Sequence, residues 1–267
     1  MDYLLFRLYG PMASWGEIAV GATRHTAHYP SKSAIVGLMA AALGIKRDNE
    51  AVQQQMQQGY EIAVEVFAQG SLLRDYHTTQ VPMGKYLSHW KTRKDEIMAV
   101  HSQERSEAKS NRPNPVLSSR EYRSDALALI AVKALADAPY DLKTIQQHLN
   151  NPVFHLYLGR KCCPLAAPLC PQIHASDTYL EAFKAYEHKP LLPCRVDAVQ
   201  SLPRRDAYWL QLNKQRHYYW EGEVTDFSGE IDTTYVQTHT RHDQPLSRRR
   251  WQFSPRQEHY FYMAGGE

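Results

Sequence analysis

Hydroxyl, ammonium and guanidinium groups are concentrated around short turns in the first 35 residues. The segment Tyr29-Pro30-Ser31-Lys32-Ser33 precedes an apolar stretch, and Thr23-Arg24-His25 lies a few residues before it. A serine that begins a helix is followed by backbone N–H groups without helical partners, and the positive end of the helix dipole attracts anions. With Lys32 in the first turn and Arg24 on the preceding loop, this segment is predicted to bind phosphate.

The surrounding pattern predicts the elements that hold these groups. An apolar, β-prone run over Tyr3–Tyr9 ends at Gly10-Pro11, and an apolar stretch from Ala34 to Leu43 closes at Gly44. This is typical of a strand followed by a buried helix over residues 32–43. Alternation over residues 61–67 predicts a second strand.

The next 90 residues complete a recognisable plan. An apolar run over 126–132 predicts a third strand, residues 141–149 predict a short helix with Asp141 at its start, and Val153–Leu158 predict a fourth strand that ends at Gly159. The order β-α-β-β-α-β is that of ferredoxin-like α+β domains, which are common among RNA-binding modules. A polar, basic stretch over 79–119 interrupts the plan and is expected to be an arm that reaches a partner.

The composition of the sequence changes after Gly159, where prolines and short aromatic runs replace long apolar segments. Three prolines between residues 164 and 171 exclude long regular elements there, and residues 178–187 predict a helix. Short aromatic-rich runs at 208–209, 217–220 and 259–262 suggest strands. We therefore expect a smaller β-rich region over residues 161–267.

Composition limits the class of protein. The chain has 267 residues, is 43% hydrophobic and 22% charged, and has a formal net charge of +3, all ordinary for a folded domain. It contains no run of 18 apolar residues and no leader-like start, so we expect a cytoplasmic protein without a membrane partner. Its four cysteines, at 162, 163, 170 and 194, form no C-x-x-C pair, which gives little support to zinc; no metal or cofactor is expected.

Positive charge is local rather than global. Residues 85–123 contain nine Lys or Arg against five Asp or Glu, and residues 237–256 contain five Arg against Asp243 alone. Such segments on an otherwise balanced surface suggest a groove for a polyanion, although runs of this size also occur as solvated loops.

Several segments in a fixed order carry a more specific signal. They are Gly10–Gly16, Thr23-Arg24, Tyr29–Ser33 leading into Gly37-Leu38, Leu73–Thr78, Tyr157–Leu165 and Ala175–Asp177. In residue type and placement they resemble the CasD family, which supplies one subunit of Cascade, the type I-E CRISPR surveillance complex. The resemblance covers the first two thirds of the chain.

The resemblance implies a fold of the RAMP type, with a ferredoxin-like palm over residues 1–160 and a thumb inserted at about 79–119. It implies a non-catalytic role in antiviral defence, in which the subunit holds the 5′ handle of the CRISPR RNA (crRNA). The expected neighbours are a CasC-type backbone subunit and a CasA-type large subunit, with CasB and CasE in the same complex. Target DNA would be reached indirectly, through guide pairing.

RNA contacts are expected from aromatic rings, polar and cationic side chains, and glycines that allow close approach. They are Ser14, Trp15, Gly16, Thr23, Arg24, His25, Tyr29, Ser31, Lys32, Ser33, Arg74, Tyr76, His77, Gly159, Arg160 and Lys161. The thumb would contribute contacts to RNA or to the backbone subunit from Lys85, Lys91, Arg93, Lys94, Arg112 and Arg120.

Packing offers a competing interpretation for some of these residues. Trp15 follows a Gly-Pro turn and would serve equally as a lid on the core, and Tyr29 would serve to staple the helix start. Arg74 and Asp75 would form a local ion pair of little net value. Gly159-Arg160-Lys161 has the weakest competing interpretation, because a glycine and two cations at a strand end have no evident packing purpose.

Two other functions remain open at this point. Metal-independent RNA cleavage would need a general base and a group that stabilises the phosphorane. The residues that would supply them are His25, His28, Tyr29, Lys32, Tyr76 and His77. A general single-stranded RNA-binding module outside CRISPR is the second alternative.

Overall fold

The computed structural model of the protein describes residues 1–19, 21–81, 92–95, 114–191, 204–210, 212, 215–247, 250 and 252–263. The chain forms two compact units. The main unit consists of Met1–Glu17, Thr26–Leu73 and Tyr122–Glu267, and the second unit consists of Ile18–His25 and Arg74–Glu121. No helix among the described residues is both long enough and apolar enough to cross a lipid bilayer.

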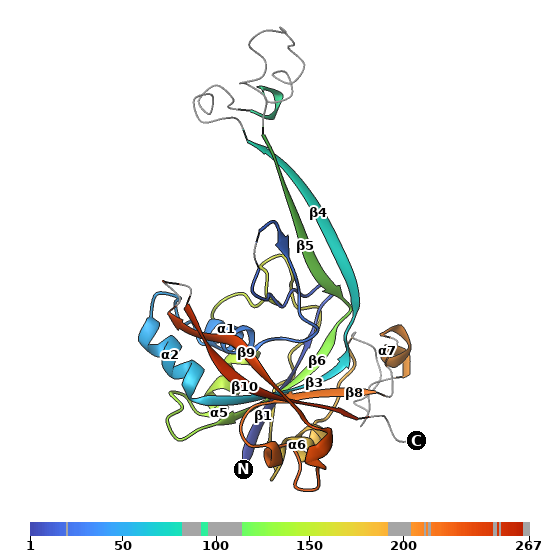
Figure 1. Cartoon of the computed structure of the whole chain (residues 1–267). Coiled ribbons are helices and arrows are strands. Elements are labelled where there is room, and N and C mark those ends of the chain that lie inside the picture. The colour runs from blue at the N-terminus through green and yellow to red at the C-terminus, as the bar shows by residue number, and fades with distance from the viewer. Residues whose placement is uncertain are drawn as a thin grey trace. The chain divides into compact units, whose positions relative to one another are not determined.

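The main unit is built on a seven-stranded sheet whose paired strands are all antiparallel (Figure 1). The strands are β1 (Asp2–Tyr9), β3 (Tyr60–Ala68), β6 (Leu127–Ala134), β7 (Gln172–Ala175), β8 (Arg216–Trp220), β9 (Gln237–Ser247) and β10 (Gln252–Met263). Their order across the sheet is β7-β1-β6-β3-β8-β10-β9. Along the chain, β1, β3, β6 and β7 are the first, second, third and fourth strands of this sheet. Across the sheet they therefore lie in the order fourth, first, third, second.

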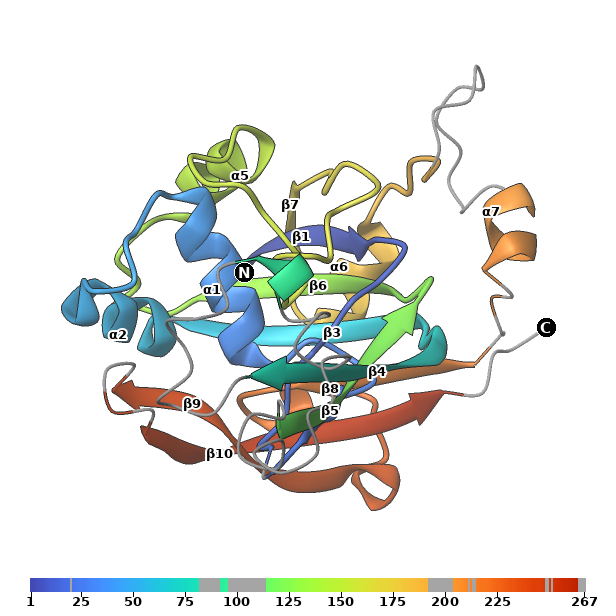
Figure 2. The ribbon, with the colours of Figure 1, turned by 90° about the horizontal axis from the view of Figure 1, so that it is seen from above.

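Five α-helices accompany this sheet in the described residues. They are α1 (Lys32–Ala42), α2 (Glu50–Gln58), α5 (Leu142–Asn150), α6 (Tyr179–Ala185) and α7 (Arg204–Trp209). The predicted helix starts are confirmed at two positions, since Ser31 Oγ accepts from the Ala34 amide and Asp141 from the Thr144 amide. Figure 2 shows α1 and α2 at one end of the sheet and α7 at the other.

The central strands are buried on both faces, which explains their nearly continuous apolar sequences. In β1, Leu4 and Phe6 belong to a cluster that includes side chains of α1, α2 and α5. The alternate residues Tyr3 and Leu5 belong to a second cluster that includes Tyr179 and Phe183 of α6. A single strand thus contributes to two hydrophobic layers.

The predicted fourth strand, Val153–Leu158, is wrong. The amides of Val153 and Phe154 donate instead to the carbonyls of Ala42 and Ala41, at 2.9 and 3.2 Å, and so satisfy the last turn of α1. The place beside β1 is taken by β7, whose residues Gln172–Ala175 pair with Asp2–Leu5. The mostly apolar sequence of Val153–Leu158 is compatible both with a strand and with a segment that caps a helix, so it could not decide between them.

The region over residues 161–267 that was predicted to be β-rich belongs to the main unit. Strand β8 pairs with β3, in register from Ala63↔Trp220 to Val66↔His217, so β8, β10 and β9 extend the sheet of the main unit. The predicted strands at 217–220 and 259–262 are confirmed within β8 and β10. The pair Tyr208-Trp209, by contrast, lies in helix α7.

The second unit contains a three-stranded sheet in the order β2-β5-β4. The strands are β2 (Thr23–Arg24), β5 (Asn114–Ser124) and β4 (Ser71–Val81), and β4 and β5 each extend into the main unit. The short β2 pairs in parallel with β5, which aligns Arg24 with Arg120. The region predicted over 79–119 as an arm without regular structure therefore begins and ends in strands.

A buried carboxyl group lies in the middle of the sheet. Glu65 of β3 accepts a hydrogen bond from the Tyr218 hydroxyl at 3.2 Å and lies 3.5 Å from Arg216 Nε. Burial raises the pKa of Glu65 to about 7, although Arg216 and the hydrogen bond oppose the shift. Between about pH 4.5 and 7 the folded protein thus retains a proton that the unfolded chain has lost.

This proton gives a testable pH dependence. The contribution of Glu65 to the free energy of unfolding is full below about pH 4.5 and falls as the pH rises through 7. Between pH 4.5 and 8 this effect lowers the free energy of unfolding of the wild type by about 3 kcal/mol. We expect the decrease to be absent in Glu65→Gln, because glutamine cannot titrate. Urea unfolding at several pH values measures it, with Glu230→Gln on the exposed surface as control. Parallel curves for wild type and Glu65→Gln would contradict the prediction.

Candidate nucleic-acid interface

The structure brings together two of the segments that the sequence singled out. The loop Gly10–Gly16 and the turn Leu158–Pro164 lie side by side, since the Ser14 amide donates to the Leu158 carbonyl at 3.0 Å. A Cβ added to Gly10 would lie 2.6 Å from the Pro164 carbonyl oxygen. The backbones of the loop and the turn approach each other so closely that only a residue without a Cβ fits at position 10.

Gly159 makes the tightest of these contacts. Its φ is +84°, and an added Cβ would lie 1.8 Å from the Ser14 carbonyl oxygen. The interpretation that this glycine has no packing purpose is therefore wrong. Gly159 seats the 158–163 turn against the first loop and in this way positions Arg160 and Lys161.

A cleft of about 470 Å³ lies beside α1 in the main unit, and we call it the α1 cleft. The first loop, the α1 face, the segment 155–160 and the β9–β10 pair all contribute to its walls. The lining residues are Ser14, Gly16, Ser31, Ser33, Ala34, Gly37, Leu38, Ala41, His155, Leu156, Tyr157, Gly159, Arg160, Pro245 and Phe253. Six of them were predicted to contact RNA, namely Ser14, Gly16, Ser31, Ser33, Gly159 and Arg160.

The chemistry of the α1 cleft suits a single-stranded nucleic acid. Tyr157 and Phe253 are 41% and 38% exposed, so each presents a ring on which a base can stack. The Arg160 guanidinium lies 4.7 Å from the centre of the Tyr122 ring, and Lys161 beside it is exposed. The described residues that line the cleft include no Asp or Glu, and phosphate would meet no repulsion from them.

The first turn of α1, however, does not offer the predicted phosphate site. The Lys32 amide donates to Asp243 Oδ2 at 3.2 Å, and the Lys32 ammonium lies 2.6 Å from Glu221 Oε2. Lys32 is only 7% exposed. The helix start thus already holds an anion, the carboxylate of Asp243 in β9, which satisfies the dipole argument from within the protein.

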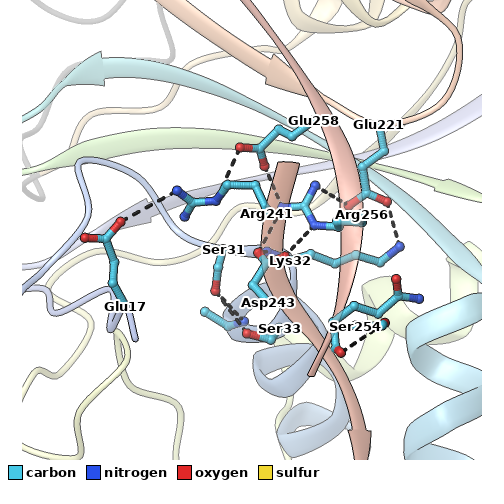
Figure 3. A network of polar contacts seen from close by, with 12 residues as sticks. Glu17, Ser31, Lys32, Ser33, Glu221, Arg241, Asp243, Ser254, Arg256 and Glu258 are labelled. Atoms are coloured by element: carbon cyan, nitrogen blue, oxygen red, sulfur yellow. Dashed lines mark hydrogen bonds and ion pairs between the residues drawn. The ribbon is translucent and has the colours of Figure 1, made fainter. Parts of the chain in front are cut away.

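A buried ion cluster surrounds this helix start (Figure 3). Arg256 of β10 binds Asp243 with two hydrogen bonds, at 2.6 and 2.9 Å, and also contacts Glu221, at 3.1 Å, and Glu258. Burial raises the pKa of Glu221, and Lys32 and Arg256 oppose that shift. We refer to Lys32, Glu221, Asp243, Arg256 and Glu258 as the Arg256 cluster.

The Arg256 cluster corrects the interpretation of the basic C-terminal segment. Arg256 is part of the cluster, and Arg241 lies 3.7 Å from Glu258 and 3.6 Å from Glu17. Arg250 is exposed, whereas Arg248 and Arg249 lie outside the described residues. Of the three arginines in this segment that the structure describes, two therefore pair with carboxylates of the protein itself.

Two predicted base platforms are buried. Trp15 is 4% exposed and belongs to the main core cluster, with its amide donating to Thr26 Oγ1 at 2.9 Å. Tyr29 is 8% exposed, stacks on Tyr219 with ring centres 3.6 Å apart, and donates a hydrogen bond to Glu258. The packing interpretation is correct for both residues.

The second unit collects most of the other predicted residues. His25 Nδ1 and the Arg74 guanidinium both contact Glu121, at 3.1 and 2.8 Å. His77 pairs with Asp75, in place of the expected Arg74–Asp75 pair. The remaining predicted residues of this unit are Thr23, which is partly buried, and Arg24, Tyr76 and Arg120, which are exposed.

The predicted thumb contacts divide into two groups. Arg93 and Lys94 are described and exposed. Lys85, Lys91 and Arg112 lie outside the described residues.

Most of the six candidate nuclease residues contact other side chains of the protein. Tyr29 and Lys32 are engaged in buried contacts, and His28 Nε2 lies 3.3 Å from an Arg123 nitrogen. Burial, followed by the charge of Arg123, lowers the pKa of His28. Within the described ranges, no group of three or more His, Cys, Asp or Glu is placed to hold a metal ion.

Sequence reasoning missed the aromatic residues of the α1 cleft. Tyr157 was placed within a strand, and Phe253 lay in a segment considered only for its charge. Phe253 carries no local signal, because it reaches the cleft through the pairing of β10 with β9. Tyr157 precedes Leu158-Gly159 and was recognisable as part of that turn.

Comparison with known proteins agrees with this fold and these segments. The sequence profile of the CRISPR-associated protein family Cas_Cas5 matches residues 3–258. The Cascade subunit CasD of Escherichia coli (strain K12) is 30% identical over 178 residues, which cover 63% of this chain and 69% of CasD. A chain in the structure of a CRISPR RNA-guided surveillance complex has the same fold, with a TM-score of 0.62 and 23% identity over 98% of this chain and 90% of its own.

The match defines first a class, the CRISPR-associated proteins. Within that class, the chain belongs to the Cas5 family, as the sequence resemblance to CasD had indicated.

The Gly159 contact predicts a large effect of one added methyl group. Gly159→Ala would force an alanine into a left-handed conformation against the Ser14 carbonyl, and we expect it to lower the free energy of unfolding by at least about 1–3 kcal/mol. Gly16→Ala is the matched control, because an added Cβ there meets nothing within 4 Å. Chemical denaturation compares the two, and equal stabilities would contradict the role assigned to Gly159.

The Arg256 cluster predicts a second effect on stability. Arg256→Met removes the cation shared by two buried carboxylates, Glu221 and Glu258, and by the partly buried Asp243. We expect a loss of about 3–5 kcal/mol, the usual cost of leaving buried charges unpaired. Arg250→Met, at an exposed position, is expected to change stability by less than about 0.5 kcal/mol. Thermal and urea unfolding of both variants test this, and a small effect at Arg256 would show that the cluster contributes little.

Proposed function

We propose that this protein is a non-catalytic, RNA-binding subunit of a type I-E CRISPR surveillance complex that holds the 5′ handle of crRNA. Membership of the Cas5 family, whose relative CasD is named as a Cascade subunit, supports the complex. The observation that carries the RNA-binding role is the α1 cleft, where the two motif segments, two half-exposed rings and Arg160 meet.

The α1 cleft would bind RNA by stacking and by charge. Unpaired bases would stack on Tyr157 and Phe253, and the apolar face of α1 around Gly37 would accept the edge of a base or a ribose. Arg160 and Lys161 would contact phosphates from the rim. The hydroxyls of Ser31 and Ser33, 3.0 Å apart, would supply polar contacts without charge.

The fold supports the same assignment. Strands β1, β3, β6 and β7 are the first to fourth strands of the main sheet along the chain, with α1 between the first and second and α5 between the third and fourth. Their order across the sheet, fourth-first-third-second, supports the proposal of a ferredoxin-like palm. We infer that the second unit is the thumb, and that Arg24, Tyr76 and Arg120 on its surface add contacts to RNA or to the neighbouring backbone subunit.

The proposed partners follow from the proposed complex. They are crRNA, a CasC-type backbone subunit beside which this protein caps the filament, a CasA-type large subunit, and CasB and CasE in the same assembly. Target DNA would be recognised by guide pairing rather than by this chain.

A nucleic-acid-binding role without catalysis is supported by the state of the candidate nuclease residues. A general base and a phosphorane-stabilising cation must both reach the RNA. Tyr29 and Lys32, which would have served, are buried in the contacts of the Arg256 cluster and its surroundings. Metal-independent cleavage of CRISPR repeat RNA is the alternative that the following experiment also tests.

Removing both rim cations should weaken RNA binding. We expect Arg160→Ala with Lys161→Ala to lower the affinity for the mature 5′ handle by about tenfold or more, and to reduce the salt slope by at most about two units. The control is Lys143→Ala with Lys184→Ala, which removes the same charge from exposed positions on α5 and α6. Filter retention over a range of salt concentrations measures affinity and slope, and equal losses in both double variants would remove Arg160 and Lys161 from the site.

The same RNA tests the absence of catalysis. Full-length repeat RNA and the mature handle are incubated with the protein, with and without EDTA, and the products are resolved on a gel. We expect retention without cleavage in both conditions. A discrete cut that survives EDTA would establish a metal-independent nuclease.

A further inference from the structure

A second cavity lies at the other end of the main sheet from α1, beside α7. It has a volume of about 450 Å³, within the range of small-ligand sites. Its walls come from the turn after β3, the turn between β5 and β6, helix α7 and strand β8. Figures 1 and 2 both show α7 on the side of the sheet opposite α1 and α2. We call this cavity the Trp209 pocket.

The floor of the Trp209 pocket is rigid. An added Cβ on Gly70, whose φ is +67°, would lie 2.3 Å from the Ser124 carbonyl oxygen, so the two turns are in backbone contact. Asp125 has a φ of 58°, a conformation that few residues other than glycine adopt, and its carboxylate accepts a hydrogen bond from the Tyr9 hydroxyl at 3.3 Å. A lining carboxylate is thus fixed in position.

A hydrogen-bonded chain orients the polar groups on the facing wall. Gln69 Nε2 lies 3.1 Å from His217 Nε2, and His217 Nδ1 lies 2.9 Å from the Tyr260 hydroxyl. Burial lowers the pKa of His217, so the imidazole stays neutral near pH 7 and offers one donor and one acceptor. The chain holds the Gln69 amide in one orientation.

An exposed indole stands at the rim. Trp209 of α7 lines the pocket and is 68% exposed, whereas the adjacent Tyr208 is 76% exposed and is not among the lining residues. A tryptophan at the rim of a polar cavity is well suited to stack on a planar ring that enters it.

We propose that the Trp209 pocket binds one unpaired nucleobase that carries an amino group, stacked on Trp209 with the amino group donating to Asp125. Guanine fits best, because two of its N–H groups can face one carboxylate. The inference rests on the proposed function only in that RNA would supply the base.

The lining discriminates among occupants. The described lining residues include Asp125 but no Lys or Arg, which disfavours a phosphate. A cationic side chain of a protein partner would need only acceptors. The pocket offers both donors and acceptors, from the Gln69 amide and the hydroxyls of Ser71 and Ser124, which matches the mixed edge of a base, while His217 uses both ring nitrogens to orient Gln69.

Calorimetry with mononucleotides and the full-length protein tests the proposal. We expect GMP and CMP to bind at least fivefold more tightly than UMP, which has no amino group. Trp209→Ala should weaken GMP binding by about tenfold, Trp209→Phe should restore most of it, and Tyr208→Ala should change it by less than twofold. Asp125→Asn, which tolerates the same backbone conformation, should remove the preference for GMP over UMP.

Three results would overturn the proposal. They are no binding of any mononucleotide, equal losses in the Trp209→Ala and Tyr208→Ala variants, and binding of N-acetyl-arginine amide without binding of GMP, which would assign the pocket to a partner's cationic side chain. None of these outcomes affects the proposed function, because handle RNA binding and its loss on substitution of Arg160 and Lys161 are measured separately.

Discussion

The candidate site depends on the Arg256 cluster, in which one guanidinium contacts three buried or partly buried carboxylates. Through Asp243 and Glu221 the cluster reaches both the backbone and the side chain of Lys32, so it ties the start of α1 to β8, β9 and β10. Taking so many charges out of water is costly, and only good geometry with hydrogen bonds on every partner compensates for it. The arrangement fixes one wall of the α1 cleft, on the helix face, relative to the opposite wall, which contains Phe253.

Most of the first half of the fold could be predicted from the sequence, because its signals are local. Strand β1 is mostly apolar, and α1 and α5 have capping residues at their starts, so the bounds of all three elements could be predicted within one or two residues. Strand β9 could not be predicted, since its sequence, QTHTRHDQPLS, is polar and, among the described residues, it pairs only with β10 at the edge of the sheet. The segment after residue 152 failed for a related reason: its partner is the end of α1, more than 100 residues earlier in the chain.

The candidate site also contains some residues that local sequence signals could identify and others that depend on distant partners. Gly159, which acts through backbone shape, could be found in the sequence as a turn residue, and it does line the α1 cleft. Charged residues were harder to interpret, because counting Lys, Arg, Asp and Glu within a segment does not reveal ion-pair partners that are distant in the sequence. Lys32 and Asp243 are 211 positions apart, yet the Lys32 amide donates a hydrogen bond to Asp243. The Lys32 ammonium, which was predicted to bind phosphate, forms an ion pair with Glu221 instead. Burial, rather than net charge, decides which cations remain available to a ligand.

The edge strand β9 has a consequence for assembly. An exposed edge of a sheet is a template onto which another chain can add a strand, and proteins block such edges with prolines, bulges and charge. Strand β9 carries Pro245, which has no N–H to offer, together with Arg241 and Asp243, and its pairing with β10 shifts register in two places. Growth of the sheet from one copy of the chain to the next is therefore disfavoured at this edge.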